Sequence, residues 1–183
     1  LIALGFTLLN MPVQMVMTHQ VALLVEIGHA KGAVASLVAL MGLASIGGKM
    51  GWGWLSDRWW LECTYLAGIG LFVAAVALLL AVGPDSTAWL LAGYAVTIGI
   101  GYAVSPALTP ILSSRFFAGP CFGTIFGTLS MIHNSAGSLG VWLAGHVHDL
   151  TGTYRPALIG GIGSAIAALI VVWLAAPRRA PGR

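Results

Sequence analysis

The sequence GGKMGWGWLSDR, residues 47–58, runs from the middle of a long apolar segment to the charged end of that segment. It carries a lysine, Lys49, at a depth where a helix surrounded by lipid does not tolerate a charge. A lysine at the centre of a bilayer costs about 2.5–3.5 kcal/mol even on insertion scales, so it must face protein or water. The stretch therefore predicts a membrane-spanning helix with one polar face.

The composition extends this prediction to the whole chain. Of the 183 residues, 58% are hydrophobic and only 7% are charged, whereas a soluble domain has about 25% charged residues. The apolar runs are long and do not alternate with polar residues, which predicts helices and not a β-barrel. We therefore expect an all-α polytopic membrane protein, embedded in a lipid bilayer and not acting as an enzyme.

Binding to nucleic acid, metal or a cofactor is not expected. The basic residues lie between the apolar runs and do not form a patch, so they report topology instead. Cys63 and Cys121 are isolated and lack the spacing of a metal site. His146 and His148 form an H-x-H pair without a third ligand at a suitable spacing, so a solvated helix end is favoured over a metal site.

Six membrane spans can be placed from the apolar runs. They cover about residues 2–25, 33–56, 64–82, 88–112, 122–147 and 156–176. One set of connections holds Arg58, Arg115, Arg178, Arg179 and Arg183, and the other holds Lys31 and Arg155 together with Glu26, Asp85 and Asp149. The positive-inside rule puts the first set in the cytoplasm. We expect a multi-pass protein of the cell membrane with both termini of the chain in the cytoplasm, residues 177–183 forming a basic tail.

The chain also repeats itself. Gly48, Gly53 and Asp57 near the end of the second span match Gly140, Gly145 and Asp149 near the end of the fifth, at one common offset (149 − 57 = 92). Because each repeat holds three spans, an odd number, the two copies cross the membrane in opposite directions. This predicts one domain, residues 1–176, made of inverted three-helix repeats at about 1–87 and 88–176. Such repeats are typical of secondary transporters.

Polar residues divide the six spans into two groups. The third and sixth spans lack charged, Asn, Gln or His residues in their apolar cores and are expected to face lipid. The other four are expected to line an aqueous cavity with Asn10, Gln14, His19, Gln20, Lys49, Thr97, Tyr102, Ser105, Thr109, His133, Asn134 and Ser135.

Several motifs resemble one family. Residues 53–58, Gly-Trp-Leu-Ser-Asp-Arg, resemble the loop signature of the major facilitator superfamily, although residues 59–62, Trp-Trp-Leu-Glu, replace its following glycine and basic pair. Lys49, continuing through Gly53 to Asp57, is similar to the eighth helix of monocarboxylate and oxalate/formate transporter-like members, where an arginine commonly stands at the Lys49 position. Residues 133–140 and 145–154 resemble their eleventh helix and its exit loop, and His19 with the loop at Gly28 resembles their seventh.

The resemblance covers nearly the whole chain as helices seven to twelve of twelve. It implies a C-terminal six-helix half, whose partner is an N-terminal six-helix half of the same transporter. Helices seven, eight, ten and eleven are then expected to line the central cavity, and alternating access is expected to come from rocking of the two halves.

Two ionisable residues are the main candidates for the substrate site. Lys49 lies eight residues before Asp57, about 12 Å along a helix. It is expected to bind a substrate carboxylate, the alternative being a lysine that extends its stem toward the interface. His133, near the middle of the fifth span, is the proton-coupling candidate because an imidazole titrates near neutral pH. A direct hydrogen bond from His133 to the substrate stays open as its alternative.

The remaining site predictions are less specific. His19 is expected either to join the substrate site or to have a structural role, and Asn134, Gln20 and Tyr102 complete the predicted substrate-binding set. The predicted gating and loop residues are Gly53, Asp57, Arg58 and Asp149. For Asp57 we expect a bond to the N-terminus of a neighbouring helix or to Arg115.

The function expected from these residues is secondary active transport of a small organic anion of the monocarboxylate or dicarboxylate type, with proton coupling as a further expectation. A non-transporting sensor or scaffold on a transporter fold is the alternative. An intramembrane enzyme is disfavoured because neither an HExxH motif nor a Gly-x-Ser-x-Gly site occurs.

Overall fold

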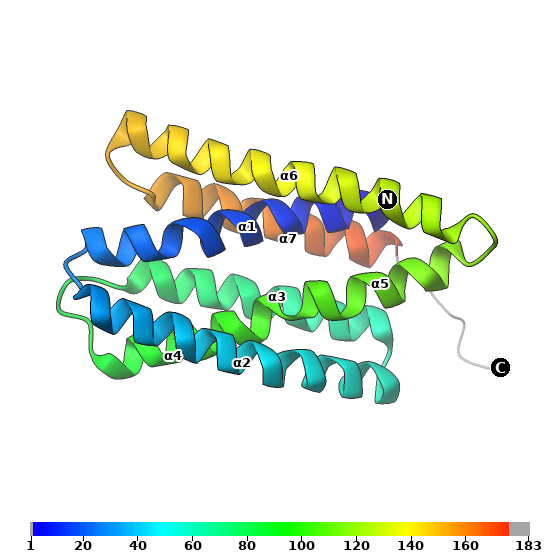
Figure 1. Ribbon diagram of the computed structural model, residues 1–183, viewed down its shortest axis with the longest axis horizontal. Helices are drawn as coiled ribbons and strands as arrows, with labels where there is room; N and C mark the ends of the chain where they lie inside the picture. The colour runs from blue at the N-terminus through cyan, green and yellow to red at the C-terminus, as the bar shows by residue number, and fades with distance from the viewer. Residues whose placement is uncertain (1, 176–183) are drawn as a thin grey trace.

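The computed structural model describes residues 2–175, and the predicted basic tail at 177–183 lies outside the described residues. The described part is helical, without a strand, and the predicted all-α fold class is confirmed. Its helices are α1 (Ile2–Glu26), α2 (Lys31–Arg58), α3 (Leu61–Ala81), α4 (Ala88–Tyr102), α5 (Val104–Phe117), α6 (Phe122–Thr151) and α7 (Arg155–Ala175), arranged as a bundle (Figure 1).

The bundle has two ends, which we name by one residue each. The Glu26 end holds the connections α1–α2, α3–α4 and α6–α7, and the Arg58 end holds α2–α3 and α5–α6 (Figure 1). Arg58 and Arg115 both lie at the Arg58 end, as the charge pattern predicts.

Helices α4 and α5 are two parts of the fourth predicted span, separated at Ala103. Pro106 explains the break, because a proline ring clashes with the carbonyl four residues before it, here that of Tyr102, and has no N–H to donate to it. Beside the break, the indole Nε1 of Trp52 donates to the carbonyl of Ile100 at 2.7 Å. Trp52, which belongs to the sequence 47–58, thus holds α2 against the end of α4.

Within the described residues, five helical units are long and apolar enough to cross a membrane: Ala3–Glu26, Lys31–Arg58, Leu61–Ala81, Ala88–Phe117 and Arg155–Ala175. The remaining predicted span, the fifth (residues 122–147), corresponds to α6. This helix is 30 residues long, but it holds His133 and Asn134 together with many serines, threonines and glycines. Its length suits a membrane span, while its composition indicates that one face meets protein or water.

The buried positions reproduce the repeat seen in the sequence. In α2 the buried residues include Ser45, Gly48 and Trp52. In α6 they are Gly137, Gly140 and Ala144, again at an offset of 92 (137 − 45, 140 − 48 and 144 − 52). The packing follows the same relation, since α2 crosses α4 and α5 as α6 crosses α1. This agreement in three dimensions supports two inverted three-helix units.

Both helix crossings depend on a glycine. A Cβ added to Gly48 would lie 3.0 Å from the Cα of Ile100 and 3.1 Å from the Cβ of Ala103, so α2 and α4 are in direct backbone contact. A Cβ added to Gly140 would meet the carbonyl oxygen of Met11 in α1. Ala103 and Met11 are themselves 92 residues apart (103 − 11). The same contact is therefore made once in each repeat.

Helices α3 and α7 pack on each other and on the two crossings. Tyr65, Ile69 and Phe72 of α3 are fully buried, as are Ala165 and Ala168 of α7. The opposite face of α7 is exposed and apolar, with Ile159, Ile166, Ile170 and Leu174. The sequence predicted that these two helices face lipid, and the exposed face of α7 fits that prediction, while the inner faces build the core.

The crossing of α6 over α1 gives a stability prediction. Replacing Gly140 by Ala should destabilise the protein by about 1–3 kcal/mol, because the added methyl group overpacks a backbone contact. The measurement is thermal unfolding in detergent. Gly127→Ala is the matched control, since it lies on the same helix and nothing lies within 4 Å of its added Cβ. Equal stability of the two variants would show that the crossing is not tight.

Candidate functional site

A cavity of about 280 Å³ lies between α1, α5 and α6. Its lining comes from the first half of α1, the whole of α5 and the first half of α6, so it occupies the half of the bundle nearer the Arg58 end. The polar residues that line it are Asn10, Gln14, Tyr102, Ser105, Thr109, Ser113, Ser130 and His133. This cavity is the candidate site.

The α5 wall of the cavity is a single helix face. Pro106 and Pro110 line it together with Ser105, Thr109 and Ser113, which follow one another at intervals of four residues. Neither proline has an N–H, so the carbonyls of Tyr102 and Pro106 lose their helical donors. The wall therefore combines hydroxyl groups with backbone acceptors that a ligand or water can satisfy.

His133 is fixed by two contacts with α1. The side chain of Asn10 donates from Nδ2 to the His133 carbonyl at 2.7 Å, and His133 Nδ1 lies 3.1 Å from the carbonyl oxygen of Phe6. A carbonyl oxygen only accepts, so Nδ1 carries the hydrogen of this bond. In the neutral ring Nε2 is consequently the acceptor nitrogen, and it is the one left for a ligand.

Ser113 marks the Arg58 end of the cavity. Its hydroxyl is buried and is one of two buried side-chain polar groups without a hydrogen-bond partner among residues 2–175. Buried hydroxyls are nearly always paired, so this one predicts a water molecule or ligand group beside it. One turn earlier in α5, the Thr109 hydroxyl lies 3.5 Å from the hydroxyl of Tyr65 in α3.

Lys49 lies beside the cavity without lining it. Its Nζ is 6.0 Å from the ring centroid of Tyr102, at the outer limit of a cation–π contact. Tyr102 is the last residue of α4 and does line the cavity. Lys49 is exposed and lies at the level of the α4–α5 break, within the membrane-spanning part of α2. The surface that the rest of the bundle leaves uncovered there is called the open side.

Three other predicted substrate residues lie elsewhere. Gln20 is buried, where it accepts a hydrogen bond from the Tyr94 hydroxyl at 2.5 Å. His19 Nε2 lies 3.0 Å from the carbonyl of Val141. Asn134 is exposed and donates to Ser130 in its own helix. The structure thus brings His133 and Tyr102 together, with Lys49 at the edge, and places these three apart from the cavity.

Six of the polar residues that line the cavity are not among the predicted substrate-site residues. Polar residues of the spans that the sequence analysis did not assign to the site are Asn10, Gln14, Ser105 and Thr109. Ser113 falls in a predicted connection, and no sequence feature singled out Ser130. The signal that could have found the α5 residues is the helical spacing of Ser105, Thr109 and Ser113 on the face of the two prolines.

The predicted loop residues lie at the two ends of the bundle. Asp57 and Arg58 are exposed at the end of α2, Gly53 is half-buried one turn before them, and the Arg58 guanidinium lies 4.7 Å over the ring of Trp54. Asp57 borders a hollow that also includes Arg115. However, Arg115 pairs with Glu62 at 3.5 Å and not with Asp57. At the other end Asp149 is 3.9 Å from His148.

Membrane-spanning helices built as two inverted units beside a polar cavity are typical of secondary transporters. The comparison with protein families agrees. The whole chain, residues 1–183, matches the model described as the Major Facilitator Superfamily. The chain therefore belongs to the Major Facilitator Superfamily, and the predicted resemblance is confirmed.

Two similar curated proteins are both named monocarboxylate transporters. The chain is 26% identical to monocarboxylate transporter 12 of Xenopus laevis over 155 residues, which is 82% of this chain and 33% of that protein. It is 27% identical to monocarboxylate transporter 13 of Rattus norvegicus over 167 residues, 85% of this chain and 36% of the relative. The chain thus spans about a third of the length of the relatives it matches.

The cavity gives a prediction about solvent access. In a background with Cys63 and Cys121 replaced by serine, Ser130→Cys should react rapidly with a charged, membrane-impermeant thiol reagent, because Ser130 lines the cavity. The control is Ser45→Cys, buried at the crossing of α2 and α4. Labelling rates measured by mass spectrometry should differ at least tenfold between the two variants, in proportion to reagent access. Equal rates would contradict an aqueous cavity.

Proposed function

We propose that this chain is one half of a secondary active transporter for a small organic anion, with the cavity as part of the substrate pathway. One observation carries the proposal. All acidic residues lie at helix ends or in loops: Glu26, Asp57, Glu62, Asp85 and Asp149. The ionisable groups well inside the helices are instead basic: His133, which lines the cavity, Lys49 of α2 beside it, and His19, which lies farther along α1. In a medium of low dielectric constant such a distribution attracts anions much more strongly than in water.

The length of the chain supports a missing second half. The chain covers about a third of relatives named monocarboxylate transporters, and Lys49, Gln14 and Asn134 are exposed on helices of the open side. A second six-helix unit placed against that side would enclose them together with the substrate. Alternating access would then arise from rocking of the two units. We place the protein in the cell membrane with the Arg58 end in the cytoplasm, because Arg58 and Arg115 lie there.

The orientation of His133 suggests how proton binding and anion binding are linked. With Nδ1 donating to the Phe6 carbonyl, neutral His133 offers only an acceptor at Nε2, and a carboxylate is itself only an acceptor. The two repel each other until Nε2 gains a proton. The imidazolium then donates to the carboxylate in a charge-assisted hydrogen bond. Proton and anion would accordingly bind together, which supports proton-coupled transport.

Lys49 would act at longer range. Its position near Tyr102 lets a short movement of the flexible stem bring the ammonium group to the cavity mouth. In this proposal Lys49 raises the local concentration of the anion and His133 provides the pH-dependent contact.

The first functional test is transport by the complete protein in proteoliposomes, with labelled lactate, oxalate and related acids as substrates. Lys49→Gln should reduce uptake at least tenfold. A hydrogen bond to a charged group contributes about 1.5–3 kcal/mol, and about 1.4 kcal/mol corresponds to a factor of ten. Lys31→Gln is the control, since this exposed lysine is the first residue of α2, next to the α1–α2 connection and away from the cavity. Unchanged uptake by Lys49→Gln would contradict the anion site. Binding without uptake by the unmodified protein would instead favour a sensor.

The second functional test concerns the pH dependence. His133→Gln should abolish the stimulation of net uptake by an acid outer solution, because glutamine cannot carry the proton. Exchange of labelled for unlabelled substrate, which needs no net proton movement, should decline less. The measurement is uptake as a function of outer pH with and without a pH gradient. An unaltered pH profile in His133→Gln would show that protons are carried elsewhere.

A further inference from the structure

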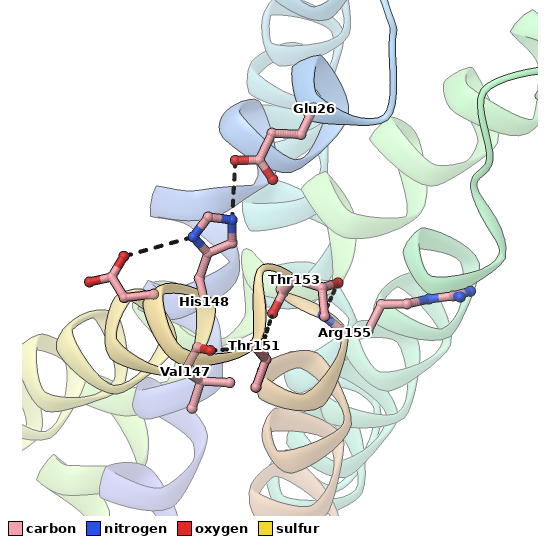
Figure 2. Close-up of polar contacts among 7 residues, drawn as sticks. Glu26, Val147, His148, Thr151, Thr153 and Arg155 are labelled. Carbon is pink, nitrogen blue, oxygen red and sulfur yellow. Dashed lines mark hydrogen bonds and ion pairs between the residues drawn. The ribbon is translucent and has the colours of Figure 1, made fainter.

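The Glu26 end of the bundle holds a group of titratable side chains that the cavity does not use. His148, in the last turn of α6, lies beside Glu26 (Figure 2), Asp149 and Tyr154, and we call these four residues the His148 cluster. Glu26 is the last residue of α1. The cluster therefore joins the ends of α1 and α6, the two helices that line the cavity in the other half of the bundle.

Both ring nitrogens of His148 face carboxylates. Nε2 lies 3.3 Å from Oε1 of Glu26, and Nδ1 lies 3.9 Å from Oδ1 of Asp149 (Figure 2). A neutral imidazole has one donor and one acceptor, so one of the two carboxylates would face a nitrogen lone pair. Only the imidazolium has an N–H for each of them. The protonated ring can therefore interact favourably with both carboxylates, whereas the neutral ring can do so with only one of them.

Tyr154 adds a second reason for a positive ring. It is buried, and its ring stacks on that of His148 with the centroids 4.1 Å apart and the planes inclined by 21°. A cation over an aromatic face is stabilised by the ring quadrupole. Burial, and then the negative charges of Glu26 and Asp149, raise the pKa of the Tyr154 hydroxyl. The phenol stays neutral, and the negative charge at the site comes from the two carboxylates.

The surrounding elements bring no competing cation into contact with the ring. His19 of α1 contacts Tyr154, with ring centroids 5.0 Å apart. Arg155, the first residue of α7, donates to the carbonyl of Leu80 in α3, and His146 stacks on Trp142. His148 is close to the C-terminus of α6, where the helix dipole favours a positive charge. Every neighbouring contact of the ring is therefore compatible with a bound proton.

We propose that the His148 cluster is a proton-binding site that holds the ends of α1 and α6 together when His148 is protonated. Loss of the proton weakens the contact with Glu26 of α1, because the ring no longer carries a positive charge, and removes the cation–π contact with Tyr154, so the two helix ends separate more readily. Since the positive-inside pattern puts this end outside the cell, an acid exterior would favour the conformation that is closed at this end. The proposal concerns conformation and does not depend on the substrate of the transporter.

The experiment measures the distance between the two helix ends in the complete protein. Cys63 and Cys121, both exposed, are replaced by serine, and spin labels are placed at Ala22→Cys in α1 and Leu150→Cys in α6, two other exposed positions. Distance distributions are recorded in detergent and in lipid nanodiscs without substrate. Between about pH 5 and pH 8 the ratio of closed to open populations should fall roughly fivefold as the pH rises.

Three variants decide the result. His148→Gln cannot be protonated, and Glu26→Gln removes the partner across the helix pair, so in both the closed population at about pH 5 should fall to that of the unmodified protein at about pH 8. His146→Gln removes an exposed histidine two residues away in the same helix and should keep the full response. A distribution that does not change with pH, or a full response in His148→Gln, would overturn the proposal. Because no transport is measured, these outcomes are independent of whether the protein carries an anion.

Discussion

The close approach of helix backbones at two glycines is the constraint on which the rest of the structure depends. Lipid offers the helices no hydrophobic reason to associate with one another, so they associate through close packing and hydrogen bonds. Gly48 lets α2 touch α4, and Gly140 lets α6 touch α1. With these crossings in place, α3 and α7 pack behind them, and the polar faces of α1, α2, α5 and α6 are left on the open side. The site is a consequence of this arrangement.

The sequence predicted the architecture well because the features that define it are local or periodic. Apolar length located the helices, and the pair Asp57 and Asp149 with their preceding glycines revealed the repeat. The structure adds that Gly48 and Gly140 are buried equivalents, which no composition argument could show. The break at Ala103 has an equally local cause, since Pro106 removes one hydrogen bond from its helix.

The candidate site was only partly predictable for a physical reason. A polar residue in an apolar helix must face protein or water, but its sequence position does not say which. Gln20 satisfies the requirement through Tyr94, and His19 through a carbonyl of α6, so both are buried away from the cavity. His133 satisfies one ring nitrogen through Phe6 and leaves the other for a ligand. The difference depends on which helix lies opposite, which is a property of the fold.

The two prolines of α5 also affect the mechanics of the bundle. A regular helix resists bending because each bend must stretch hydrogen bonds between successive turns, and such bonds are absent at the carbonyls of Tyr102 and Pro106. The Trp52 indole meanwhile fastens the end of α4 to α2 through Ile100. One half of the span is thus anchored while the other is compliant. A change in the tilt of α5 would alter the width of the cavity and leave the glycine crossings in place, so a moving wall can coexist with a rigid frame.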